Sequence, residues 1–409
     1  MRDLKRPAFM QKAAMGKRGH MAILEILIAF LVFIVSSFVM GIIQVPLMTL
    51  YLMSDETYMQ LLLKGDMASF SKAMEIALQV PDWLMIVVLM SEILMIVVIL
   101  LYCRLLEKRT PDTMGFRKKK LISQYIIGAI AGVVFFSVAY LLCLLTGSIH
   151  FDGLTENILP IYIIGYLIGY MVQGMAEEVL CRGYLFVSLT RRYSVSYSIV
   201  ISAVFFALLH GMNSNLTFLA MINLFLFGVF AALMLVKYEN IWIVGAFHSL
   251  WNFAQGNLYG IQVSGNSLQK SVFASTSREG MSIIHGGAFG MEGGLAVTLV
   301  LAAGIAYLIW ALKREGKIVE QPVPMVFAKP GQNMADSAPG ETMTSGTNVS
   351  AKVPVASTDS APQVSEAQQR ENMGIQPGET PWHPDTAASQ NTQEPAQKQT
   401  TFNADYFKD

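Results

Sequence analysis

The sequence has little charge. Only 14% of its 409 residues are Asp, Glu, Lys or Arg, whereas 53% are hydrophobic, and the mean hydropathy is +0.46. Soluble domains carry roughly a quarter charged residues, so this composition is that of a membrane protein. A basic surplus is also missing, because 29 Lys and Arg are balanced by 29 Asp and Glu. This balance argues against a nucleic-acid partner, which a basic surface would serve.

Cysteine is scarce throughout, and proline is scarce before residue 318. Cys103, Cys143 and Cys181 stand in apolar runs at unrelated spacings, and they predict neither a disulfide framework nor a Cys-based zinc site. Ten of the 15 prolines follow residue 318, where polar residues and Ala replace the apolar runs. Such a composition buries too little apolar surface to order itself. We therefore predict that residues 318–409 form a disordered cytoplasmic tail, which can recruit cytoplasmic partners.

Long apolar runs fill the chain between residues 21 and 317. The first follows a basic N-terminus, residues 1–20, and is too long for a signal peptide. A helix of about 18 or more apolar residues can cross a hydrocarbon core of roughly 30 Å. We predict an all-α bundle of about eight transmembrane helices, near residues 21–48, 84–103, 121–146, 158–190, 195–212, 216–236, 240–256 and 293–312.

The loop charges give this bundle an orientation. When eight spans are threaded alternately, the basic loops fall on the side of the N-terminus, including the seven Lys and Arg of residues 104–120. Residues 318–409 hold five basic and 11 acidic residues, which leaves 24 basic and 18 acidic for the membrane domain. Because Lys and Arg accumulate on the cytoplasmic side, we predict a multi-pass protein of the cell membrane with both termini cytoplasmic.

The few ionisable residues inside the apolar runs are costly there and require a partner or a purpose. Glu178 and Arg182 are four residues apart, so they are neighbours on one helix face and can neutralise each other. Glu177 points about 100° away from Glu178 and has no local cation, which suits a general base. The alternative is that all three form a buried ion-pair network that holds helices together.

Two further segments carry polar residues to a similar depth. Glu177 and His210 lie about equally far from the turn near Tyr193, so an antiparallel hairpin places them level. His248 and Asn252 share one face at i and i+4, and the Asn252 amide can donate to an oxyanion. Separate interhelical hydrogen bonds are the alternative interpretation. Three helices with polar residues at one depth favour a shared site.

Such a site suits amide hydrolysis, because a carboxylate, two imidazoles and an amide can activate water and stabilise a tetrahedral intermediate. Glu177, His210 and His248 would equally hold zinc, so zinc remains possible, with no metal assigned. No HExxH or GxSxG motif is present. Two alternatives are a proton-coupled transporter, although no inverted repeat is visible, and a catalytically silent membrane scaffold.

Three motifs occur in order on successive apolar runs: EExxxR from Glu177 to Arg182, FxxxH from Phe206 to His210, and HxxxN from His248 to Asn252. Together they resemble the CPBP or Abi family, the CAAX-protease and bacteriocin-processing intramembrane peptidases related to type II CAAX prenyl endopeptidases. The resemblance covers about residues 110–256, beginning near Met114 to Arg117.

This resemblance implies an intramembrane endopeptidase that cleaves a membrane-associated or lipidated peptide, or a protein of bacteriocin immunity. It implies that Glu177 activates water with His210, that Glu178 and Arg182 orient the first helix with Phe206 in support, and that His248 and Asn252 bind water and the oxyanion. Both a metal-dependent and a glutamate-dependent mechanism remain open. Glu92 lies outside the motifs near the middle of its span, and we predict a structural role for it.

Overall fold

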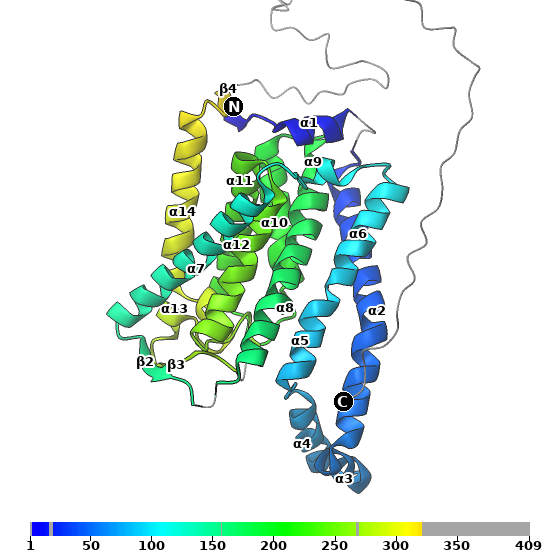
Figure 1. Ribbon diagram of the computed structural model, residues 1–409, viewed down its shortest axis with the longest axis vertical. Helices are drawn as coiled ribbons and strands as arrows, with labels where there is room; N and C mark the ends of the chain where they lie inside the picture. The colour runs from blue at the N-terminus through cyan, green and yellow to red at the C-terminus, as the bar shows by residue number, and fades with distance from the viewer. Residues whose placement is uncertain (1, 16–18, 157, 267–269, 321–409) are drawn as a thin grey trace, which may run out of the picture. The chain divides into compact units, whose positions relative to one another are not determined.

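The structure is a computed structural model, which describes residues 2–15, 19–156, 158–266 and 270–320. These residues belong to one compact unit, Met1–Ser337. Its long helices run side by side (Figure 1). The disordered tail predicted for residues 318–409 lies outside the described residues from position 321 onward.

A helix forms in each of the eight apolar runs. Five helical segments are long and apolar enough to cross a membrane, namely α2, α5 with α6, α7, α11 and α14. The predicted helical membrane bundle is therefore confirmed as a fold class. The bounds are α2 (Ala22–Ser54), α5 (Asp82–Ser91), α6 (Ile93–Leu105), α7 (Leu121–Leu145), α8 (Pro160–Glu178), α10 (Val195–Leu209), α11 (Phe218–Tyr238), α12 (Ile241–Phe253) and α14 (Leu295–Arg314).

Two of these helices continue as π-helix, which the sequence did not indicate. Helix α8 passes into η2 (Val179–Phe186) and then α9 (Val187–Thr190), and α12 passes into η3 (Ala254–Leu258). The π-helical stretch of η2 begins directly after the adjacent acids Glu177 and Glu178. Such wide turns occur frequently at functional sites, because they change the direction in which side chains leave the helix.

Shorter elements join the long helices. Pro7, Pro81, Pro111 and Pro160 stand at helix starts, where a missing backbone N–H costs nothing. The short helices and 3₁₀ turns are α1 (Ala8–Ala14), α3 (Glu56–Lys64), α4 (Met67–Ala77), α13 (Ser282–His285), η1 (Pro111–Met114), η4 (Gly287–Phe289) and η5 (Met291–Gly293).

Two strand pairs also form, although we predicted no strand. β1 (Arg2–Leu4) pairs antiparallel with β4 (Ile318–Glu320), and β2 (Ile149–Leu154) pairs antiparallel with β3 (Phe273–Ser277). The first pair brings the beginning and the end of the described chain to the same end of the bundle (Figure 1). Three residues that we assigned to the tail are thus part of a strand. Which side of the membrane this end faces stays a prediction.

Helix α12 packs tightly against both α7 and α8, because glycines remove side chains at the two crossings. A Cβ at Gly132 of α7 would stand 2.3 Å from the Phe247 carbonyl oxygen. A Cβ at Gly174 of α8 would stand 2.6 Å from the Ser249 backbone nitrogen. Real Cβ atoms do not approach backbone so closely, so only Gly permits these contacts. They bring the backbone beside His248 directly against α8.

Candidate active site

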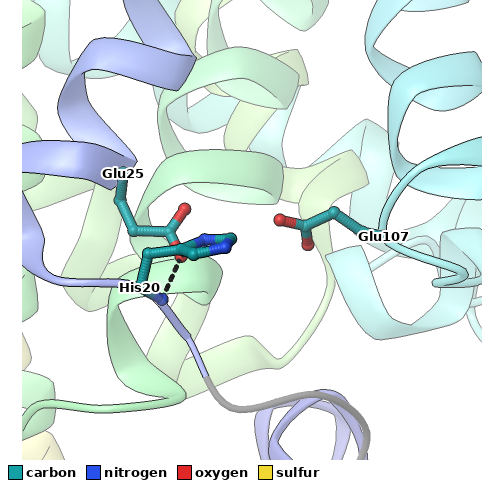
Figure 2. A group of neighbouring side chains, drawn as sticks. All are labelled: His20, Glu25 and Glu107. Carbon is teal, nitrogen blue, oxygen red and sulfur yellow. Dashed lines mark hydrogen bonds and ion pairs between the residues drawn. The ribbon is translucent and has the colours of Figure 1, made fainter.

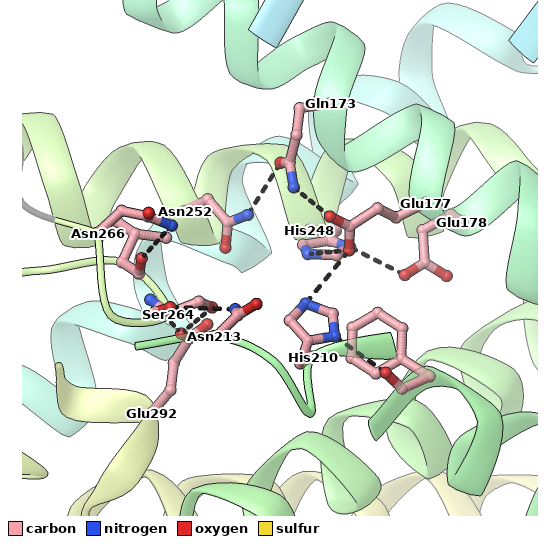
Figure 3. A network of polar contacts seen from close by, with 12 residues as sticks. Gln173, Glu177, Glu178, His210, Asn213, His248, Asn252, Ser264, Asn266 and Glu292 are labelled. Carbon is pink, nitrogen blue, oxygen red and sulfur yellow. Dashed lines mark hydrogen bonds and ion pairs between the residues drawn. The ribbon is translucent and has the colours of Figure 1, made fainter. Parts of the chain in front are cut away.

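Glu177 faces two imidazoles that come from different parts of the chain (Figure 3). Its Oε2 lies 3.7 Å from His210 Nε2 and 3.8 Å from His248 Nε2. Glu177 is on α8, His210 follows the last residue of α10, and His248 is on α12. The side chains are mostly buried, with exposed fractions of 21%, 13% and 5%. The structure thus brings together three of the residues that the sequence placed at one depth.

The hydrogen bonds of the two imidazoles define which nitrogen carries the proton. His248 Nδ1 lies 2.9 Å from Glu178 Oε1, and His210 Nδ1 lies 2.9 Å from the Phe206 carbonyl oxygen. A carboxylate and a carbonyl only accept, so Nδ1 donates in both residues. In the neutral form each Nε2 is therefore an acceptor. Both Nε2 atoms are directed at the same oxygen of Glu177, which has no hydrogen-bond partner of its own.

A buried ion pair supports His248 from behind. Arg182 Nη1 donates to Glu178 Oε1 over 3.0 Å, and both side chains are fully buried. The same Glu178 oxygen accepts the bond from His248. The Arg182 guanidinium also lies 4.4 Å from the centre of the Phe206 ring, a cation–π distance. Glu178, Arg182 and Phe206 therefore tie together the three elements that carry the site.

Gln173 is a site residue that the sequence analysis missed. Its Nε2 donates to Glu177 Oε1, and its Oε1 accepts a bond of 3.0 Å from Asn252 Nδ2. The Asn252 amide keeps a second N–H, while its Oδ1 is buried without a partner. The signal was present, because Gln173 stands one helical turn before Glu177 in an apolar run. Neither pattern marked it, because Gln173 is not ionisable and lies outside the three motifs.

These residues line a cavity of about 410 Å³, with Glu178 standing behind its wall at His248. Another polar group closes the cavity on the side of the segment after η3 (Figure 3). There Asn213 Nδ2 donates to the Ser264 carbonyl over 3.0 Å, and Ser264 Oγ donates to Glu292 Oε2 over 2.6 Å. Glu92, for which we predicted a structural role, also lines the cavity.

Glu177, His210 and His248 are chemically suited to zinc, but their spacing does not fit a compact zinc site. In a tetrahedral site with bonds of about 2.0–2.2 Å, the ligand atoms lie roughly 3.5 Å apart. Within the described part of the chain, only one group of three has all its ligand atoms within 4.8 Å of one another, and it is elsewhere. The Glu177 distances are short enough, so the two imidazoles are too far apart.

That other group consists of His20, Glu25 and Glu107, with His20 Nδ1 3.2 Å from Glu25 Oε1 (Figure 2). Two guanidiniums neutralise it, because Arg109 and Arg191 lie 3.1 and 2.7 Å from Glu107 Oε2. Two carboxylates and two guanidiniums have no net charge. A divalent cation would therefore add uncompensated positive charge at this place, and we assign no metal there.

The protein is thus a helical membrane bundle in which a carboxylate faces two imidazoles, an arrangement suited to acid–base chemistry. One family model matches part of the chain. Residues 159–254 match the family described as Type II CAAX prenyl endopeptidase Rce1-like. This segment, less than a quarter of the chain, contains all three motifs. Residues 159–254 are therefore similar to type II CAAX prenyl endopeptidases, a family of membrane endopeptidases. No curated protein and no solved structure matches the chain significantly.

Proposed function

We propose that this protein hydrolyses a peptide bond of a membrane-associated or lipidated peptide, with Glu177 as general base. The observation that carries the proposal is the convergence of His210 Nε2 and His248 Nε2 on one unpartnered oxygen of Glu177. A water between these side chains can donate hydrogen bonds to Glu177 Oε2 and to an imidazole Nε2, which are acceptors. Its own lone pair is then free to attack a carbonyl carbon.

The proposed reaction balances with the residues of this chain alone. Glu177 takes a proton as the water oxygen bonds to the carbonyl carbon, and negative charge develops on the carbonyl oxygen. The free N–H of Asn252 donates to that oxygen. The C–N bond then breaks, and the proton on Glu177 passes to the leaving amine. Gln173 and Glu178 act as positioning residues, since they hold Glu177 and His248 through hydrogen bonds.

The bundle restricts the substrate to one that reaches the membrane. The cavity is lined by many apolar side chains besides the polar ones, and several of the helices around it, α2, α5 with α6, α11 and α14, are long enough to cross a bilayer. A soluble peptide would have to leave water to enter such a place. A hydrophobic or lipid-anchored peptide is already there, which favours it as the substrate class.

Cleavage of a fluorogenic lipidated peptide by the purified protein in vesicles tests the proposal. We expect Glu177→Gln and His210→Ala to lower the rate by roughly 10² to 10⁴, the usual contribution of a general base and its partner. Glu156→Gln, an exposed acid before α8, is the matched control and should cleave as the wild type does. Chelation of divalent metals should leave the rate unchanged.

Each other outcome of this experiment has a defined meaning. Unchanged cleavage by both variants would remove Glu177 and His210 from the mechanism. Loss of rate upon chelation, with metal present in elemental analysis, would replace the metal-free step by a metal-dependent one. Equal loss of folded protein and of cleavage in both variants would favour the scaffold interpretation, in which these residues only hold the helices together.

A further inference from the structure

Glu92 is an acid that neither the three motifs nor the proposed mechanism uses. It stands roughly midway along the span Asp82–Leu105, at the one-residue interruption between α5 and α6. Its Oε2 is buried and has no hydrogen-bond partner. An ionised group in the middle of a membrane is costly unless it is paired. No partner within the described chain offsets this cost at Oε2, although the side chain borders the cavity.

The packing of α5 against α8 places Glu92 beside the candidate active site. A Cβ at Gly165 would stand 2.7 Å from Ile86 Cδ1, and one at Gly169 would stand 3.0 Å from Leu89 Cβ. The contacts advance together along both helices, so α5 and α8 run in the same direction. One turn further, Glu92 is level with Gln173, which is itself one turn of about 5.4 Å before Glu177.

Most of the buried unpartnered atoms that line this cavity are acceptors, although Trp251 Nε1 is an unpartnered donor. Unpartnered buried oxygens come from three of its lining residues, Glu92, Glu177 and Asn252, of which Asn252 is only 4% exposed. The Nε2 atoms of His210 and His248 are acceptors as well. Among the described lining residues there are three Glu side chains, the third being Glu292, and neither Lys nor Arg. The guanidinium of Arg182 is not part of this lining and donates through Nη1 to Glu178.

The side of the cavity around Glu92 is apolar. Besides Ser37, α2, α5 and α6 contribute methionines and other apolar side chains to the lining, namely Phe33, Met40, Met85, Val88, Leu89 and Met95. Methionine adapts its shape to a variable neighbour. A carboxylate in a mostly apolar lining suits a side chain with an aliphatic stem and a cationic end, which is the structure of Lys and Arg.

From these observations we propose that Glu92 forms a cation-binding subsite, which receives a lysine or arginine side chain of the substrate next to the peptide bond that is cleaved. This inference rests on the proposed function, because it names the substrate class of the same cavity. The cation supplies the donor that Glu92 Oε2 lacks and compensates its charge. The same three acids repel a substrate side chain that brings a carboxylate next to the scissile bond.

Cleavage of three hydrophobic peptides tests the subsite. The peptides are identical except for Lys, norleucine or Glu next to the scissile bond, and kcat/KM is measured for each. We expect the wild type to prefer Lys over norleucine by about tenfold or more, and Glu to be the poorest. In Glu92→Gln the ratio of Lys to norleucine should fall to about one, and Glu92→Asp should restore part of it. Glu156→Gln should keep the wild-type ratio.

A ratio that stays unchanged in Glu92→Gln would overturn the subsite, and so would an equal loss for all peptides, which indicates a purely structural acid. Binding separates this failure from failure of the proposed hydrolysis. Decylamine should raise the thermal stability of Glu177→Gln more than decanol does, and the difference should vanish when Glu92→Gln is added. If no peptide is cleaved but decylamine stabilises more than decanol, the cation-binding subsite is supported and the proposed hydrolysis is wrong. If decylamine stabilises no more than decanol, the subsite is wrong.

Discussion

The molecule contains two kinds of buried acid, and they differ in how their charge is compensated. Glu107 lies 3.1 and 2.7 Å from two guanidiniums, and Glu178 lies 3.0 Å from a third. Glu177 and Glu92, in contrast, have no Lys or Arg among the described residues of the cavity that they share. Their unpartnered oxygens border space that a substrate can fill.

This difference separates acids that hold the fold from acids that are available for chemistry. Removing one member of a buried ion pair leaves the other charged and unpaired, which is strongly destabilising. Removing an acid that has no cation leaves no opposite charge unpaired. We therefore expect the paired acids to affect stability first and the unpaired acids to affect activity first. Variants of each kind can break or sharpen this comparison.

The largest effect on stability is expected from Arg182→Met. The change leaves the fully buried Glu178 without its guanidinium and removes the cation–π contact with Phe206. Breaking a buried pair in this way costs about 3 to 5 kcal/mol. Thermal unfolding in detergent measures the loss. Arg104→Met, an exposed position in the last turn of α6, is the matched control and should change little. A Glu177→Gln variant as unstable as Arg182→Met would erase the distinction between the two kinds of acid.

The sequence predicted the features of this arrangement that depend on neighbouring residues, but not those that depend on contacts between distant segments. Apolar runs and the i, i+4 spacing of Glu178 and Arg182 depend on neighbouring residues only, so the helices and this pair were accessible. The level placement of Glu177 and His210 came from one hairpin. The π-helical turn of η2 and the hydrogen bond of Gln173 to Asn252 depend on how α8 meets α12, which no local pattern encodes.

The position of Glu92 also depends on contacts between distant segments, which the sequence alone does not show. The sequence marked it as a costly acid without a local partner, and we predicted a structural role. Its position beside the cavity depends on the glycines of α8 that let α5 approach, Gly165 and Gly169. Likewise, Ser264 and Glu292 belong to the segment after η3, whose return to the cavity has no signal in hydropathy.

A smaller effect on stability, combined with a clear effect on activity, is expected from Gly174→Ala. The new Cβ would stand 2.6 Å from the Ser249 backbone nitrogen, so α8 and α12 must separate. Overpacking of this kind costs about 1 to 3 kcal/mol. Because Glu178 on α8 holds His248 on α12 at 2.9 Å, we expect at least a tenfold loss of peptide cleavage as this bond lengthens.

Gly41→Ala provides the control for that change. The nearest atom to a Cβ at Gly41 of α2 is Val45 Cγ2 at 3.9 Å, an ordinary contact within the same helix. The substitution should keep activity and stabilise the helix by roughly 0.5 to 1 kcal/mol. If Gly174→Ala also kept full activity, the close crossing of α8 and α12 would not be what positions His248.

The smallest effect on stability is expected at an exposed ion pair. Its acid differs from both kinds above, because it is paired but not buried. Lys12 Nζ lies 2.5 Å from Asp112 Oδ2 and joins α1 to η1, and both side chains are about half exposed. The hydrogen bond from Lys12, together with that from Thr110, lowers the pKa of Asp112 below 3.8. A carboxyl pKa that is lower in the folded state than in the unfolded state stabilises the fold at pH values above the unfolded-state pKa. This contribution is lost as the pH falls through the folded-state pKa.

Exposed pairs contribute about 0.2 to 1 kcal/mol, so Lys12→Ala should cost no more than this at pH 7. Thermal unfolding of the variant and the wild type should converge as the pH falls through the lowered pKa of Asp112, where the folded carboxyl becomes protonated. A loss as large as that of Arg182→Met would show that compensation of charge, rather than burial together with compensation, decides which acids hold this fold.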